Sequence, residues 1–92
     1  SATMVLPNFF SPNSDGVNDA FQPRMQHADW TLWSVYNRWG VLVFSTEDLG
    51  ASWNGRVQGN LAAPGVYFVT ARCGSNEVGN TVELRGAIHL FD

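Results

Sequence analysis

The segment from residue 13 to residue 19 carries the side chains of this sequence best suited to bind a metal ion. Asn13, Asp15, Asn18 and Asp19 place four oxygen-bearing side chains within seven residues, around a glycine. Calcium takes about six to eight oxygen ligands from carboxylates, side-chain amides and backbone carbonyls. The candidate calcium ligands are Asn13, Asp15, Val17, Asn18 and Asp19.

A second interpretation of the same segment needs no metal. Asn and Asp side chains commonly accept hydrogen bonds from nearby backbone N–H groups in Asx turns. The segment also lacks the later bidentate glutamate of an EF-hand. The spacing favours the metal-free turn and leaves a calcium ion as the alternative; no other cofactor is indicated.

The remaining reactive side chains form no catalytic set. His27 and His89 are far apart and stand in no metal-binding or catalytic spacing. No serine lies in the Gly-x-Ser-x-Gly context of a nucleophile elbow. Cys73 has only Arg72 as a cationic sequence neighbour, which favours a buried, inert thiol. The sequence therefore predicts that the protein is not an enzyme and has no small-molecule substrate.

Tryptophan offers a different chemistry, because an exposed indole ring can bind a sugar. Trp53, followed by Asn54 and Gly55, could lie on such a groove, as in carbohydrate-binding modules. The favoured interpretation is that Trp53 fills one end of the core and that the two residues after it form a turn. Among the other tryptophans, Trp39 is expected to be the most exposed, because it stands next to a turn.

Composition excludes several classes of protein. Hydrophobic residues make up 45% and charged residues 14% of the 92 residues, which rules out a disordered chain. The five basic residues are all arginines scattered along the chain, so nucleic-acid binding is disfavoured. No apolar run approaches the ~20 residues of a membrane span. The first residues do not resemble a signal peptide, and the chain is expected to be a piece of a larger protein.

The elements that position these residues are expected to be strands. Thirteen glycines and prolines divide the chain into short pieces, which is typical of an all-β sandwich. Residues 4–10 predict a first strand with Pro7 at an edge or bulge, and residues 21–25 predict a short second strand. Residues 30–37 predict a central strand with apolar residues on both faces, covered on both sides. Residues 37–40 then turn the chain into residues 41–45.

The second half of the chain follows the same scheme. Residues 47–61 are expected to form a loop, and residues 66–73 a clear strand introduced by the pair Pro64-Gly65. A polar hairpin tip over residues 74–80 leads to a last strand over residues 81–91, with a bulge at Gly86. The fold class is therefore all-β, an immunoglobulin-like antiparallel β-sandwich of about seven strands.

Five motifs follow one another at compatible spacing. They are Asn-Phe-Phe-Ser-Pro-Asn-Ser-Asp-Gly-Val-Asn-Asp (8–19), Tyr-Asn-Arg-Trp-Gly-Val-Leu-Val-Phe (36–44), Trp-Asn-Gly-Arg (53–56), Pro-Gly-Val-Tyr-Phe (64–68) and Arg-Gly-Ala-Ile-His-Leu (85–90). In this order they resemble the signature of the gliding motility-associated C-terminal domain, also called the type B sorting domain of type IX secretion. The resemblance covers residues 5–90.

The resemblance implies a function. Residues 1–92 would be a single C-terminal sorting domain that directs a large N-terminal cargo on the same chain through the periplasm and across the outer membrane. The partners implied are the outer-membrane translocon and a porin-like accessory protein, the protein would be secreted or held at the cell surface, and the isolated domain would be a monomer. Cargoes of such domains include adhesins and polysaccharide-degrading enzymes.

Recognition by another protein requires an exposed surface. Arginine and tryptophan are enriched at binding hot spots, so the turn at residues 37–40 is a candidate, and the free edge of the last strand is a second. The candidate recognition residues are Asn37, Arg38, Trp39, Gly40, Arg85 and Gly86. The alternatives are a carbohydrate-binding or adhesive module that uses Trp39 or Trp53, and a structural immunoglobulin-like spacer of a cell-surface protein.

Overall fold

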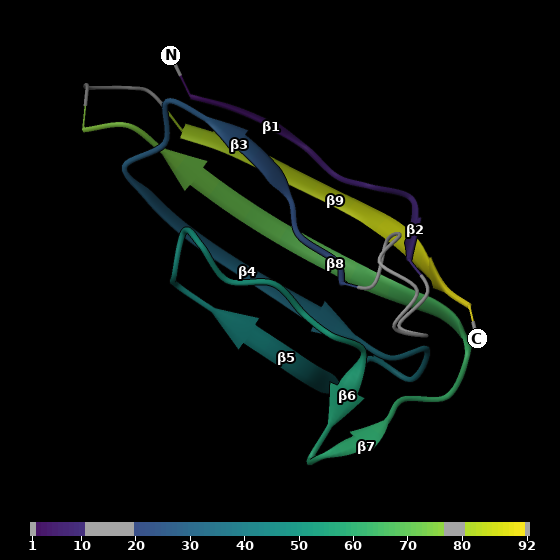
Figure 1. The fold of residues 1–92 in the computed structure, drawn as a ribbon. Helices are drawn as coiled ribbons and strands as arrows, with labels where there is room; N and C mark the ends of the chain where they lie inside the picture. Colours follow the sequence, from purple (N-terminus) through teal and green to yellow (C-terminus); the bar gives the residue numbers. More distant parts are fainter. Residues whose placement is uncertain (1, 11–19, 77–80, 92) are drawn as a thin grey trace.

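All regular structure in the computed structural model is β-strand. The structure describes residues 2–10, 20–76 and 81–91. Within these ranges the strands, coloured along the chain in Figure 1, are β1 (Thr3–Val5), β2 (Phe9–Phe10), β3 (Arg24–Gln26), β4 (Trp30–Tyr36), β5 (Leu42–Thr46), β6 (Arg56–Val57), β7 (Asn60–Leu61), β8 (Gly65–Gly74) and β9 (Thr81–Leu90). The all-β prediction is confirmed. No helix in the described part of the chain has the length and apolar character to cross a membrane.

A five-stranded sheet is the main element of the fold. Its strand order is β2-β9-β8-β4-β5, and every pair is antiparallel except β2 with β9, which is parallel. β4 and β8 therefore occupy its interior, as predicted for residues 30–37. The aromatic and β-branched residues of β4 suit this position, because their side chains pack well on a pleated surface.

The expectation that both faces of β4 are covered is wrong. Side chains alternate along the strand: Trp33 and Val35 are fully buried, whereas Leu32 is 39% exposed. The same alternation on β8 buries Val69 and leaves Phe68 exposed. The sheet thus buries one face, and the opposite face is open to solvent among the described residues.

β8 and β9 form the longest ladder, and its register runs without a shift over all ten residue pairs. The bulge expected at Gly86 is therefore wrong. Gly86 pairs regularly with Val69, and a Cβ added there would make an ordinary contact, 3.6 Å from Leu6 Cδ1. The irregularity in this sheet lies instead between Val35 and Tyr36, where β4 shifts its register against β5.

The first predicted strand is two strands in two different sheets. β1 pairs antiparallel with β3, whereas β2 pairs with the end of β9. Pro7 lies between them, where a residue without a backbone N–H loses no ladder hydrogen bond. In Figure 1 the chain runs alongside β9 as β1 and then turns down into the main sheet as β2.

The expected loop over residues 47–61 is also more ordered than predicted. It contains the hairpin of β6 and β7, whose turn residues Gln58 and Gly59 both have positive φ, at 53° and 84°. Two positive φ values are the geometry of a type I′ turn, the turn that suits a tight β-hairpin. This hairpin was not predicted because a type I′ turn favours Asn or Asp at its first position, whereas this turn has glutamine there.

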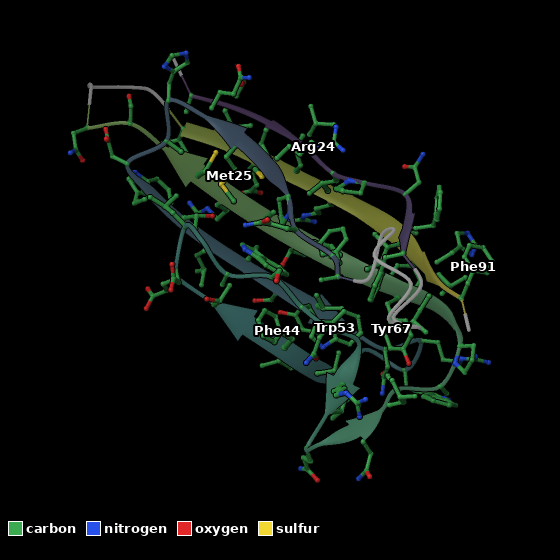
Figure 2. All side chains as sticks on the ribbon, in the orientation of Figure 1. Arg24, Met25, Phe44, Trp53, Tyr67 and Phe91 are labelled. Atoms are coloured by element: carbon green, nitrogen blue, oxygen red, sulfur yellow. The ribbon has the colours of Figure 1, made fainter. Side chains whose placement is uncertain are left out.

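Aromatic rings pack the segments outside the main sheet, called the covering layer below, against the buried face of that sheet. Phe21 and Trp53 exchange two backbone hydrogen bonds of 2.8 Å across this layer. Figure 2 shows the side chains of Phe44, Trp53 and Tyr67 in a row between the sheet and the segments in front of it. The rings of the core are Phe10, Phe21, Trp33, Phe44, Trp53 and Tyr67, in contact at centroid distances from 5.1 to 6.5 Å. Each such pair adds about 0.5–1.5 kcal/mol beyond the burial of area.

Candidate recognition site

The turn between β4 and β5 is held by one asparagine. Asn37 Oδ1 accepts hydrogen bonds from the backbone N–H groups of Trp39 at 3.0 Å and Val41 at 2.9 Å. The Asn37 carbonyl accepts from Gly40 N–H, and Asn37 N–H donates to the Val41 carbonyl, both at 2.9 Å. Gly40 has φ +80°, a conformation that costs a glycine little. The turn predicted at residues 37–40 is confirmed, and four hydrogen bonds fix its shape.

Arg38 and Trp39 are the exposed residues of this turn. The Trp39 side chain is 77% exposed, the largest value among the exposed large hydrophobic residues described. The Arg38 guanidinium lies over its ring, with Cζ 5.3 Å from the ring centroid, which is a cation–π contact. The predicted exposure of Trp39 is confirmed.

Arg38 also connects the turn to the start of β8. Its Nη2 atom lies 2.9 Å from the place that a Cβ on Gly65 would occupy, and Gly65 has φ +138°. The backbone conformation therefore favours glycine at this position, and any larger residue would also displace the end of the Arg38 side chain. The sequence pattern predicted only a Pro-Gly turn here; the contact with Arg38 comes from the packing of two motifs that are distant in sequence.

Tyr67 lies next to this contact and is buried. Its hydroxyl donates a 2.6 Å hydrogen bond to the Ala63 carbonyl. Burial raises the pKa of Tyr67 above its usual value, and the positive charge of Arg38 opposes this shift. The neutral phenol is thus held as a structural donor at the base of the turn.

Trp53 belongs to the core and not to a surface groove. Its side chain is 1% exposed, and its Nε1–H donates to the Arg56 carbonyl at 3.1 Å. Asn54 Oδ1 accepts from the Arg56 N–H at 3.1 Å, and Gly55 has φ +77°. The favoured interpretation of Trp53 is confirmed, and its use as a sugar-binding surface is contradicted by this burial.

Arg85 and Gly86 lie elsewhere on the sheet. Arg85 pairs with Thr70 on β8, five residues from the point where Gly65 pairs with Leu90. At ~3.3 Å per residue, Arg85 is therefore roughly 16 Å along the ladder from the Gly65 end, where Arg38 packs. The candidate recognition residues thus form two separate groups: the turn at residues 37–40, and Arg85 with Gly86.

The other reactive side chains give no chemical site in the described residues. Cys73 is buried, and burial raises the pKa of its thiol, so the prediction of an inert thiol is supported. His89 stacks on Phe91 with ring centroids 6.0 Å apart. No group of three His, Cys, Asp or Glu side chains capable of holding a metal occurs within residues 2–10, 20–76 and 81–91.

The calcium hypothesis falls outside this part of the chain. All its candidate ligands lie between residues 11 and 19, beyond the described residues. They are Asn13, Asp15, Val17, Asn18 and Asp19. Calcium binding by this segment therefore stays a prediction.

Comparison with known protein families identifies a match over nearly the whole chain. The model of the CHU_C type IX secretion signal domain matches residues 4–90, which is nearly the whole chain. No curated protein and no solved structure matches the chain at a significant level.

Proposed function

Because the chain belongs to the CHU_C family of type IX secretion signal domains, we propose that it acts through recognition of the turn at residues 37–40 by the secretion machinery. A domain of this family is a C-terminal signal for type IX secretion and has a non-catalytic role. It marks its protein for transport across the outer membrane to the cell surface or the exterior.

The observation that carries the proposal is the exposure of Trp39 on a rigid turn. A large apolar side chain gains nothing for folding when it is 77% exposed to water. The turn that holds it is fixed by four hydrogen bonds, so little conformational entropy would be lost when a partner binds. Tryptophan and arginine, here in contact with each other, are the residue types most enriched at binding hot spots.

The partners that we propose are the outer-membrane translocon and a porin-like accessory protein. Arg85 and Gly86 would belong to a second contact, because they lie far along β9 from the turn. The domain would extend over residues 1–92, with a large cargo preceding it on the same chain. Recognition by a protein partner needs a surface of suitable shape with exposed side chains, and it does not need a deep cleft in this domain.

We also propose an immunoglobulin-like arrangement of the two layers. The sheet order β9-β8-β4-β5 would correspond to strands G, F, C and C′ of an immunoglobulin domain. The antiparallel pair of β1 and β3 would then correspond to strands A and B in the opposite layer. The passage of the chain from β1 into β2 supports this assignment, because the first strand contributes to both layers.

Export of a reporter protein fused to this domain tests the proposed function. The fusion is expressed in a bacterium that carries the type IX secretion system, and the exported fraction of the reporter is measured. Trp39→Ala is expected to lower this fraction by roughly tenfold or more, the loss typical of a hot-spot residue. Arg38→Ala is expected to lower it less.

Matched variants separate recognition from folding. Leu61→Ala removes another exposed apolar side chain and Arg24→Ala another exposed arginine, so both should leave export unchanged. The melting temperature of each purified domain shows whether it folds. Wild-type export by a folded Trp39→Ala and Arg38→Ala pair would contradict recognition through the turn.

A further inference from the structure

The outer edge of β9 is only partly paired. β2 covers its end, where Phe9 pairs with His89 and Phe10 with Leu90. On that side no strand of the described residues is hydrogen-bonded to the segment 81–87, although β1 packs against β9. Within the part of the chain that the structure describes, these seven residues of the sheet edge are therefore unpaired, and an unpaired edge can accept another strand.

The backbone groups of β9 alternate along the strand, pointing either toward β8 or outward from the edge of the sheet. The N–H of His89 donates to the Asn8 carbonyl, so His89 directs its N–H and C=O outward, away from β8. The period of a strand is two residues. Since the register of β8 and β9 is unbroken, Arg85 and Glu83 also direct their N–H and C=O groups outward.

The two edges of the main sheet differ in how well they resist strand addition. Proline, bulges and twisted short strands normally protect an edge. β5 has five residues, and its pairing with β4 contains a register shift. The free part of β9 contains neither a proline nor a shift. The free part of β9 is therefore the longer edge and the one with the more regular pairing.

Positive side chains outnumber negative ones in the ion pairs beside this part of β9. Glu83 Oε2 accepts from Arg72 Nε at 3.2 Å, while the same carboxylate lies 3.7 Å from Arg85 Nη2. One carboxylate therefore serves two guanidinium groups. The Arg85 side chain, 78% exposed, has the longer contact, and two arginines with one glutamate leave a net positive charge beside this part of β9.

The inner side of the same edge is apolar. Val82 and Leu84 are partly buried against the core, and Leu6 lies above Gly86. A strand added here would meet apolar side chains on its inner face and Arg85 on its outer face, because side chains alternate between the two faces.

We propose that β9 accepts an extended segment of the secretion machinery as an additional strand along residues 81–87. That segment would place apolar side chains toward Val82 and Leu84 and an acidic side chain opposite Arg85. The proposal rests on the proposed function and names the chemistry of one partner segment. Backbone hydrogen bonds would supply affinity and the acidic residue the register.

Proline substitutions test the edge, using the same reporter fusion. Arg85→Pro removes an outward N–H that makes no bond to β8, so the sheet should be retained. The matched control is Ser45→Pro. Ser45 pairs with Ser34, and the alternation of backbone groups along the sheet directs the Ser45 N–H away from β4, toward solvent. Arg85→Ala removes the charge and keeps the N–H.

The proposal predicts a graded result. Arg85→Pro should lower the exported fraction by roughly tenfold, Arg85→Ala by roughly threefold, and Ser45→Pro not at all. If the purified Arg85→Pro domain does not melt cooperatively, Arg85→Glu replaces it, with Arg24→Glu as its control; a like charge should then repel the acidic segment.

Three outcomes would overturn the proposal. The first is wild-type export of the folded Arg85 variants; the second is an equal loss of export for Ser45→Pro. The third is sedimentation of the purified domain as a dimer that Arg85→Pro converts to a monomer, because the edge would then pair with a second copy. Export of the wild-type fusion tests the sorting activity, and export of the Trp39→Ala fusion tests recognition through the turn, so failure of the proposed function and failure of the edge proposal are distinguishable.

Discussion

Two tryptophan-containing turns of this domain have almost the same local chemistry and opposite environments. In each, an asparagine side chain accepts backbone hydrogen bonds and a glycine adopts positive φ, +80° at Gly40 and +77° at Gly55. Yet Trp39 is exposed, and Trp53 is fully buried. The turn chemistry therefore does not decide where the indole ring goes.

The strand pairing around each turn decides it. Trp53 is bonded to Phe21 through two backbone hydrogen bonds in the layer that covers the sheet, so its ring points into the core. There it contacts Phe10 at 5.4 Å and Tyr67 at 5.4 Å. Trp39 lies in the turn between β4 and β5 and remains 77% exposed. One motif therefore stabilises the fold, and the other is free for recognition.

Truncation of the buried ring should have the largest effect on stability. Trp53→Ala is expected to lower the free energy of unfolding by about 3–5 kcal/mol, because it leaves a cavity among several aromatic rings. Trp39→Ala should change it by less than about 0.5 kcal/mol. Urea unfolding of the purified domains measures both. Similar losses for the two variants would break the comparison.

The next largest effect is expected where the exposed turn contacts the start of β8. Gly65→Ala should lower the free energy of unfolding by about 1–3 kcal/mol, because alanine resists the φ of +138° and its Cβ would displace the Arg38 guanidinium. Gly86→Ala is the control, with ordinary space and an ordinary φ. Urea unfolding should show no loss comparable to that of Gly65→Ala for this control.

Most of the strands could be predicted from the sequence, because their signals are local. Residues 30–36 combine aromatic and β-branched side chains, and the turn pair Pro64-Gly65 indicates the start of β8. The turn at residues 37–40 could also be predicted, since Asn37 and Gly40 each supply what such a turn needs locally. The exposure of Trp39 followed from that turn.

The features that the sequence did not predict depend on residues far apart in the chain. One face of the main sheet is open because the covering layer packs only on the other face, and this packing involves segments distant in sequence. Leu32 is apolar, so its sequence position did not indicate that it would be exposed. The division of the first strand depends on its two different partners, β3 and β9. Gly86 resembled a bulge because glycine is common in bulges, whereas the register that excludes one is set by β8.

The candidate site was predictable in its residue types but not in its layout. The sequence motifs put Arg38 and Trp39 on one turn, and the structure agrees. The separation of that turn from Arg85 follows from the long ladder of β8 and β9, which no single motif encodes. The contact between Arg38 and Gly65 likewise joins two motifs through the sheet.

The asparagines that hold the two turns should differ in proportion to their hydrogen bonds. Asn37 Oδ1 accepts two backbone hydrogen bonds and Asn54 Oδ1 accepts one. At about 1 kcal/mol for each net hydrogen bond, Asn37→Ala should lower the free energy of unfolding by about 2 kcal/mol and Asn54→Ala by about 1 kcal/mol. Thermal unfolding of both purified variants measures the difference. A larger loss for Asn54→Ala would mean that the buried turn is held more tightly than the exposed one.

The smallest effect is expected at Tyr67, which lies between the two turns: its ring contacts Trp53, and the charge of Arg38 acts on its hydroxyl. Burial raises the pKa of Tyr67 from 10.0, so the unfolded chain releases this proton more readily than the folded one. The stabilising effect is therefore complete below pH 10.0 and is lost as the pH rises through the folded pKa. Arg38→Ala removes the opposing influence of the guanidinium, raises the pKa of Tyr67 further and extends this loss to higher pH.

Urea unfolding across the alkaline range measures this loss, and Tyr67→Phe identifies the part that belongs to this phenol. The part that remains in Tyr67→Phe includes the buried thiol of Cys73, whose pKa is also raised, from 9.0. The difference between the wild type and Arg38→Ala should stay below about 0.5 kcal/mol, because Arg38 is exposed and its charge is screened. If Arg38→Ala still changes the pH dependence of unfolding in the Tyr67→Phe background, the effect belongs to another titrating group. Arg38 and Tyr67 would then not connect the two turns electrostatically.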